Sequence, residues 1–189
     1  MSHDAHDDNS NSIFKITLSL AVTAFISGII LATTYAITEP VAAEQRVKAK
    51  NDAMRELVKD AESFKAVDGK EGWYAGIKGG KAIAYVVPAN SKGYGGTIEI
   101  LAAVTPEGKT MDYKVLKHNE TPGLGDKMVE PKFRNQFAKK EAKDLEVVKV
   151  PTDKNIQSLT GATITSKAVT KGVKEAVEAV AAYAATQKK

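Results

Sequence analysis

A run of 22 residues without a charged side chain, residues 16–37, limits most strongly how this chain can fold. At about 1.5 Å per residue, a helix of that length spans roughly 33 Å, enough to cross the hydrocarbon core of a bilayer. The alternatives are a buried helix and a cleaved signal peptide, which would have a basic leading segment and a shorter apolar core. Lys15 is the single Lys or Arg before the run, although residues 41–43 are similar to a cleavage site. We predict a retained transmembrane helix over residues 13–37, after a disordered polar tail over residues 1–12.

The charges that flank this run do not decide its orientation. Lys15 lies on one side, whereas Arg46, Lys48 and Lys50 lie on the other. Counted literally, the positive-inside rule would place the rest of the chain in the cytoplasm. The difference is small, and whole domains cross the membrane largely regardless of charge.

The segment after the run has the composition of a second helix. Pro40 suits the first turn of a helix, and the following residues are rich in Ala, Glu, Gln, Lys and Arg. Apolar residues such as Val47, Met54 and Leu57 fall on one face. We predict a connecting helix within residues 38–66 that leaves the membrane and packs on a domain formed by residues 67–189.

Within that domain the hydrophobic period is no longer helical, and short segments separated by Gly- and Pro-bearing turns are predicted as strands. Few long strands between end helices favour an α+β domain with a mainly antiparallel sheet flanked by helices, rather than a doubly wound sheet. The predicted strands are residues 73–77, 82–87, 98–104, 111–118 and 145–150, and the predicted helices are residues 131–139 and 166–185.

The composition excludes several functions. The chain has no cysteine, which rules out disulfides, thiolate catalysis and cysteine-ligated iron–sulfur or zinc sites. His3 and His6 lie in the polar tail, where a weak metal site is the less favoured interpretation, and His118 stands alone. A net charge of +4 without a basic run interleaved with aromatics argues against nucleic acid. There is no Walker or dinucleotide fingerprint and no serine–histidine–acid arrangement, so a hydrolase is disfavoured.

Residues 158–166, Ser-Leu-Thr-Gly-Ala-Thr-Ile-Thr-Ser, lead directly into the last predicted helix. Free amides and the helix dipole at such a start favour an anion, above all a phosphate. Gly161 allows close backbone approach, Ala162 leaves room, and the hydroxyls offer partners for a phosphoester. The alternative is structural, with Thr165 or Ser166 as the helix N-cap and the glycine as a turn.

Two other glycine-bearing loops are candidates for ligand contact. Residues 118–127 contain Glu120, Thr121 and the Pro-Gly-Leu-Gly turn, and could wrap a planar ligand. Residues 92–97 place Tyr94 among three glycines, where its ring could cover a ring system. Taken alone, each loop is better explained as a simple turn.

In this order, Gly-Tyr-Gly-Gly, Glu-Thr-Pro-Gly-Leu-Gly and Thr-Gly-Ala-Thr-Ile-Thr-Ser resemble the FMN-binding domain shared by two related respiratory complexes. The resemblance covers the anchor and nearly the whole domain. Length and the single N-terminal span are most similar to the G subunits of Rnf-type complexes, which move electrons between ferredoxin and NAD coupled to sodium or proton translocation. The C subunit of the sodium-translocating NADH:quinone reductase is the alternative.

The resemblance implies covalent FMN, joined through its phosphate to the hydroxyl of Thr163 by a separate flavin transferase outside the cytoplasm. The domain would then be extracytoplasmic, and its partners would be the other subunits of the complex and the membrane. The remaining cofactor-binding residues implied by the motifs are Thr160, Gly161, Ala162, Thr165, Ser166, Glu120, Thr121, Gly123, Leu124 and Tyr94.

One position departs from the family pattern. An acidic residue usually stands three positions before the first Ser or Thr of the attachment motif, and here that position is Gln157. This departure leaves open a non-redox alternative, an anchored scaffold that keeps the fold without flavin. A soluble flavin reductase with exchangeable FMN conflicts with the apolar span.

Overall fold

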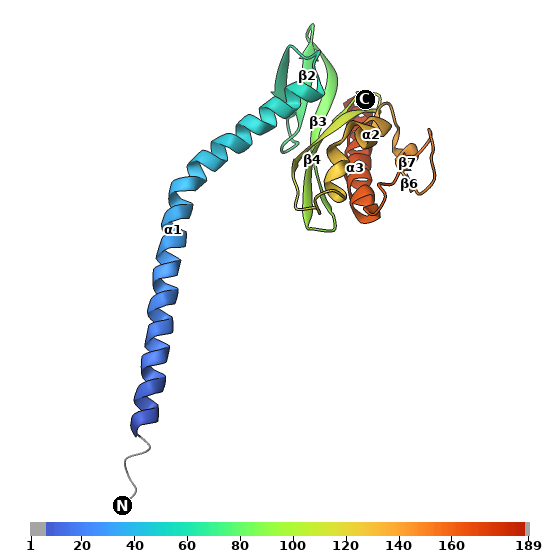
Figure 1. Ribbon diagram of the computed structural model, residues 1–189. Helices are drawn as coiled ribbons and strands as arrows, with labels where there is room; N and C mark the ends of the chain where they lie inside the picture. Colours follow the sequence, from blue (N-terminus) through green and yellow to red (C-terminus); the bar gives the residue numbers. More distant parts are fainter. Residues whose placement is uncertain (1–6, 188–189) are drawn as a thin grey trace, which may run out of the picture. The chain divides into compact units, whose positions relative to one another are not determined.

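The computed structural model describes residues 7–187, and the side chains of residues 13–187. The chain forms two compact units, divided between Lys48 and Ala49. Helix α1, Asp7–Leu57, begins in the first unit and ends in the second (Figure 1). Residues 7–12 are therefore helical rather than disordered, and residues 1–6, with His3 and His6, lie outside the described part.

Helix α1 also corrects the prediction of a new helix beginning at Pro40. The helix continues through this proline without a break. An interior proline costs a backbone hydrogen bond, but helix-forming residues on both sides sustain the helix beyond it. The predicted membrane span and the predicted connecting helix are thus one element of 51 residues.

The first unit exposes its large apolar side chains. Phe14, Phe25 and Leu31 are each about 70% exposed, and α1 is the one helix of the described residues long and apolar enough to cross a bilayer. A soluble helix normally buries such a surface. This exposure is consistent with the predicted membrane anchor.

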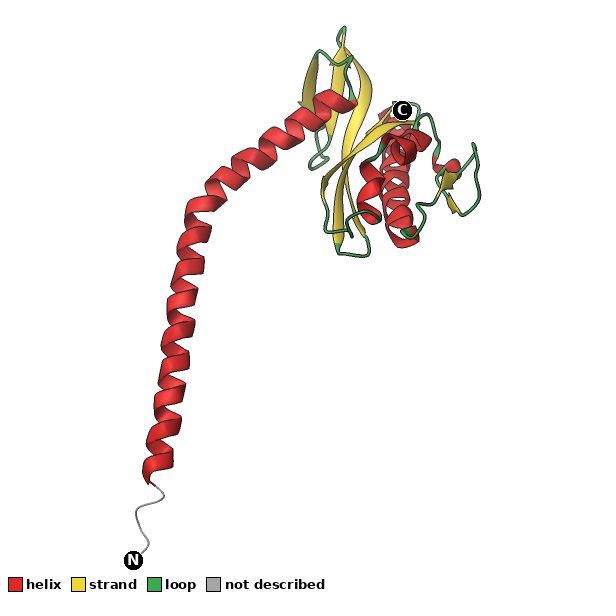
Figure 2. Ribbon diagram, in the orientation of Figure 1, coloured by secondary structure: helices red, strands yellow, loops and turns green. Residues whose placement is uncertain are grey.

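The second unit is built on a five-stranded antiparallel sheet in sequence order β1-β2-β3-β4-β5, which confirms the α+β prediction. Its strands are drawn in yellow in Figure 2. Strand β1 is absent from the predicted strands, because its four residues directly follow a helical pattern and lack a clear alternation of their own. The strands are β1 (Ser63–Ala66), β2 (Tyr74–Lys78), β3 (Lys81–Lys92), β4 (Thr97–Val104) and β5 (Thr110–Lys117).

Strand β3 is longer than the predicted strand over residues 82–87, because it continues through residues 88–92. Pro88 pairs with Leu101 of β4, whereas pairing with β2 ends at Val86. Beyond Val86 the strand has a partner on one side only, and an edge of this kind tolerates a proline. The consequence is that β3 and β4 carry their hairpin turn to residues 93–96, at one end of the sheet.

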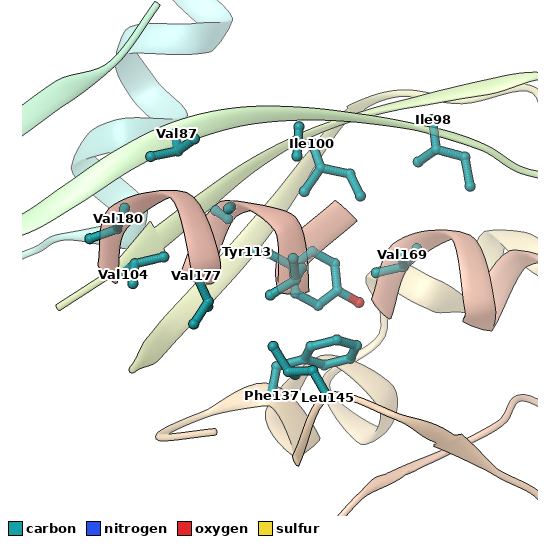
Figure 3. Packing of buried hydrophobic residues seen from close by; sticks show 14 of the residues in the cluster. Val87, Ile98, Ile100, Val104, Tyr113, Phe137, Leu145, Val169, Val177 and Val180 are labelled. Carbon is teal, nitrogen blue, oxygen red and sulfur yellow. The ribbon is translucent and has the colours of Figure 1, made fainter. Parts of the chain in front are cut away.

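Helix α3, Thr163–Gln187, covers one face of the sheet (Figure 1). Its residues Val169, Val173, Val177 and Val180 are at most 1% exposed. They pack with strand residues and with Tyr113, Phe137 and Leu145, as the close view in Figure 3 shows. This is the main core of the domain, and it fixes α3 relative to the β3–β4 hairpin.

The other face of the sheet is packed by the end of α1. Met54 and Leu57 are buried there against Val86 and Leu101, whereas Val47 is 62% exposed. The predicted packing on the domain is therefore confirmed for the last turns of the helix and wrong for Val47.

Short elements carry the chain from β5 to α3. They are η1 (Gly125–Val129), α2 (Pro131–Arg134), η2 (Asn135–Phe137), η3 (Ala142–Asp144), β6 (Val147–Val148) and β7 (Ile156–Gln157). The predicted helix over residues 131–139 is split between α2 and η2, and the predicted strand over residues 145–150 is reduced to β6. Strands β6 and β7 pair in parallel.

Candidate functional site

The three glycine-bearing loops meet at one end of the domain and line a single open cavity of about 570 Å³. That volume lies within the range usual for small-molecule sites. The lining residues are Tyr94, Glu120, Thr121, Leu124, Gly125, Gly161, Ala162, Thr163, Ile164 and Thr165. Segments far apart in the sequence are thus brought together.

The first loop is the turn between β3 and β4, closed by a hydrogen bond of 2.7 Å from the Gly93 amide to the Gly96 carbonyl. A Cβ atom on Gly95 would lie 1.8 Å from the Asn119 carbonyl oxygen, so only glycine allows this loop to approach the second. Tyr94 between them is 73% exposed, with its ring available at the cavity.

The second loop, residues 118–127, folds around the carbonyl of Thr121. This oxygen accepts hydrogen bonds from the amides of Leu124 at 3.2 Å and Gly125 at 3.1 Å. The resulting turn places Leu124, 42% exposed, and Gly125 in the wall of the cavity.

The third loop turns at Gly161, whose φ of +78° is a conformation that glycine adopts readily. Helix α3 begins two residues later at Thr163, three residues earlier than predicted. Thr163 is therefore at the helix start and lines the cavity. The first amides of a helix lack intrahelical partners and favour an anion.

Neither predicted N-cap residue caps this helix. The buried Thr165 hydroxyl donates to the Glu120 carboxylate across the cavity wall. The buried Ser166 hydroxyl donates to the Ala162 carbonyl at 2.9 Å and accepts from the Leu159 amide. Both lie inside the helix because it starts earlier than the sequence indicated, so their hydroxyls hold the loop in place.

Eight of the eleven predicted site residues line the cavity, whereas Thr160, Gly123 and Ser166 do not. Thr160 instead lines a neighbouring hollow with Gln157. Sequence reasoning missed Gly125 and Ile164. Gly125 could have been found as the second glycine of the Gly-Leu-Gly turn. No sequence signal pointed to Ile164, which is 54% exposed at the helix start.

Charged side chains outside the cavity hold α2, the short helix that follows the second loop. Arg134 of α2 donates to both carboxylate oxygens of Asp112 in β5, at 2.7 and 2.6 Å, and to Glu56 at 3.2 Å. The hydrogen bond to Asp112 raises the pKa of Arg134, and the hydrogen bond from Lys114 lowers the pKa of Glu56. This network fixes α2, which directly follows the second loop and η1.

The cavity combines apolar and polar groups in a way that suits binding. Tyr94, Leu124 and Ile164 offer exposed apolar surface to a planar ring. Thr163 and the helix start offer a hydroxyl and free amides to a phosphate. The Nδ1 atom of His118 accepts a hydrogen bond from the backbone amide of Glu120 at 3.2 Å, and His118 does not line the cavity. The described lining residues thus include no histidine that could activate a hydroxyl for hydrolysis.

Residues 93–178 match the protein family described as FMN-binding domain, which includes all three loops. The structure is similar to the crystal structure of NqrC from Shewanella oneidensis, with a TM-score of 0.51 and 19% identity. That match covers 68% of this chain and 73% of the other, and it supports the fold alone.

Two curated relatives are similar over almost the whole chain. The G subunit of the proton-translocating ferredoxin:NAD(+) oxidoreductase complex of Clostridium ljungdahlii is 60% identical, covering 95% of this chain and 97% of the relative. The G subunit of the Na(+)-translocating ferredoxin:NAD(+) oxidoreductase complex of Acetobacterium woodii is 32% identical, covering 88% and 90%.

Proposed function

Because this chain belongs to the G-subunit family of Rnf-type ion-translocating oxidoreductase complexes, we propose that it carries FMN covalently on Thr163 and relays electrons within such a complex. The observation that supports this most directly is the position of Thr163. It stands at the first residue of α3 and lines the cavity formed by all three motif loops. A hydroxyl held there can bear a phosphoester while the rest of the cofactor lies in the cavity.

The residues present fit this cofactor. The first-turn amides of α3 would face the phosphate, where the helix dipole favours negative charge. Tyr94, Leu124 and Ile164 would pack against the flavin ring, since each exposes apolar surface at the cavity. When bound, FMN accepts and releases electrons, and the protein contributes position and electrostatic environment.

Covalent attachment gives an extracytoplasmic domain a physical advantage. A non-covalent flavin is lost by dilution in an open compartment, whereas a phosphoester does not dissociate. We propose that α1 crosses the membrane once, that the domain lies outside the cytoplasm, and that a separate flavin transferase installs the cofactor there. The other subunits of the complex are the electron partners, and the coupling ion is sodium or a proton, as in the names of the two relatives.

The covalent tether is tested by denaturing electrophoresis of the full chain co-expressed with a flavin transferase. The wild type should show in-gel flavin fluorescence. Thr163→Val should abolish it, because no other residue is expected to carry the ester. Thr160→Val is the matched control within the same motif and should keep its fluorescence, since Thr160 lies outside the cavity.

Absence of fluorescence in folded wild-type protein would contradict the proposal and favour the scaffold alternative suggested by Gln157. Fluorescence that persists in Thr163→Val but disappears in Thr160→Val would place the ester on the other threonine.

The side of the membrane has a separate test, because the chain has no native cysteine. Glu178→Cys introduces one thiol at an exposed position of α3. A membrane-impermeant thiol reagent should label this variant in intact cells if the domain is extracytoplasmic. Labelling that requires cell lysis would place the domain in the cytoplasm.

A further inference from the structure

Glu120 is a nearly buried carboxylate at the junction of the three loops. It is 5% exposed, yet it lines the cavity. Its oxygens accept hydrogen bonds from the amides of Gly95 at 2.8 Å and Tyr94 at 3.3 Å, and from the hydroxyl of Thr165. One side chain of the second loop is therefore bonded to both the first loop and the first turn of α3.

Two glycines leave room for the Glu120 carboxylate. A Cβ atom on Gly125 would lie 3.0 Å from the Oε2 atom of Glu120 and 2.8 Å from the hydroxyl oxygen of Thr165. A Cβ atom on Gly93 would lie 2.5 Å from the other carboxylate oxygen, Oε1. Both glycines thus keep the space that this carboxylate occupies, which accounts for their presence in two of the three loops.

The charge of Glu120 has no cationic partner. Across the side chains described, residues 13–187, no Lys, Arg or His lies within salt-bridge distance of it. It is also the one charged residue in the cavity lining. Its oxygens accept from three donors, and a carboxylate in a partly buried site acts strongly on nearby groups.

We infer that Glu120 is a positioning residue that ties the first and second loops to the start of α3, and that its uncompensated charge lowers the reduction potential of the flavin. The second half of this inference rests on the proposed function. Reduction adds negative charge to the ring, and a fixed carboxylate beside it disfavours that change. Since Thr165 lies two residues after Thr163, the same hydrogen bonds orient the attachment residue toward the cavity.

The electrostatic role is tested by spectroelectrochemical titration of the detergent-solubilised full chain carrying flavin. Glu120→Gln should favour the reduced flavin about tenfold. This corresponds to a midpoint potential raised by about 59 mV for a one-electron step. Thr165→Val removes a hydrogen bond but keeps the charge, so its shift should be much smaller. Glu130→Gln, an exposed carboxylate outside the cavity, is the charge control and should not shift the potential.

An unchanged potential in Glu120→Gln, or an equal shift in Thr165→Val, would overturn the electrostatic role. Glu120→Asp provides a second test that keeps the charge and shortens the side chain. It should retain a potential close to that of the wild type while its unfolding temperature falls. A potential as high as that expected for Glu120→Gln would contradict the inference.

The positioning role is tested without flavin, in the Thr163→Val background. There, Glu120→Ala should lower the thermal unfolding temperature by more than Thr165→Val, because it removes three hydrogen bonds rather than one. If the Glu120 variant unfolded at the same temperature as Thr163→Val alone, Glu120 would not tie the loops together. A wild type without flavin would contradict the proposed function but leave this measurement valid.

Discussion

Helices α1 and α3 are both long and rich in apolar residues, but they bury them in different ways. In α3, four valines are at most 1% exposed beneath the sheet, whereas Phe25 and Leu31 of α1 are each 71% exposed. The sheet provides the partner for α3. For the part of α1 in the first unit, no surface within the described residues does so, which is consistent with a membrane anchor. The comparison teaches that hydrophobicity alone does not place a helix; the available partner does.

The comparison would be broken most clearly by placing a charge in each helix. Val173→Asp should abolish cooperative folding of the domain. The free-energy cost of burying an unpaired carboxylate exceeds the free energy of unfolding of a typical domain. Leu20→Asp should leave the thermal unfolding of the domain unchanged and instead reduce membrane insertion. Circular dichroism melts and carbonate extraction measure the two effects. Comparable loss of domain stability in Leu20→Asp would contradict the assignment of α1.

A second test sharpens the contrast along α1 itself. Leu57 is 5% exposed at the end of the helix, and Val47 is 62% exposed. Leu57→Ala should destabilise the domain by about 2–5 kcal/mol, whereas Val47→Ala should change stability by less than about 0.5 kcal/mol. Urea denaturation in detergent gives both values. Equal effects would show that the packed part of the helix starts earlier.

A smaller effect is expected for the polar group within the α3 core. The Tyr113 hydroxyl donates to the Met128 carbonyl just before α2, and the tyrosine is fully buried. Tyr113→Phe leaves that carbonyl without its donor and should cost about 1–3 kcal/mol in urea denaturation. Tyr94→Phe is the control, because its ring is mostly exposed and its stability should hardly change. A neutral Tyr113→Phe would mean that the carbonyl finds another donor.

The smallest expected effect is a pH dependence at the end of α1. Glu56 has a lowered pKa, chiefly because Lys114 donates to it at 2.6 Å. Its contribution to stability is present above its ordinary pKa of 4.5 and is lost as pH falls through the lowered value. Unfolding temperatures of wild type and Glu56→Gln should therefore differ near neutral pH and converge in acid. A constant difference across this range would contradict the ion pairs.

Much of this architecture was predictable because it depends on local patterns. The apolar run, the short apolar segments of β2 and β4 between their turns, and the valine face of α3 each indicated their element. Strand β1 and the extension of β3 past Pro88 were not predictable in this way, since pairing with distant strands determines them. The prediction of a helix start at Pro40 was wrong because a local preference was outweighed by the residues around it.

The site likewise has parts that the sequence predicts and parts that it does not. The three loops were identified from their motifs, and the structure brings eight of the eleven residues together. The hydrogen-bond partner of Thr165 was not predictable. Its hydroxyl donates to Glu120, 45 residues away, instead of capping its own helix. Such a contact exists only after the core has set α3 against the β3–β4 hairpin.

The residue that departs from the family pattern is held by its peptide group. The Gln157 amide donates to the side-chain carbonyl oxygen of Gln136 at 2.7 Å, and the Gln157 carbonyl accepts from the same side chain at 3.4 Å. A second glutamine thus binds the backbone at position 157 as a neighbouring strand would, whatever side chain stands there. The backbone at position 157 is thus positioned by Gln136 and not by its own side chain, so replacing that side chain should leave the course of the chain into the third loop unchanged.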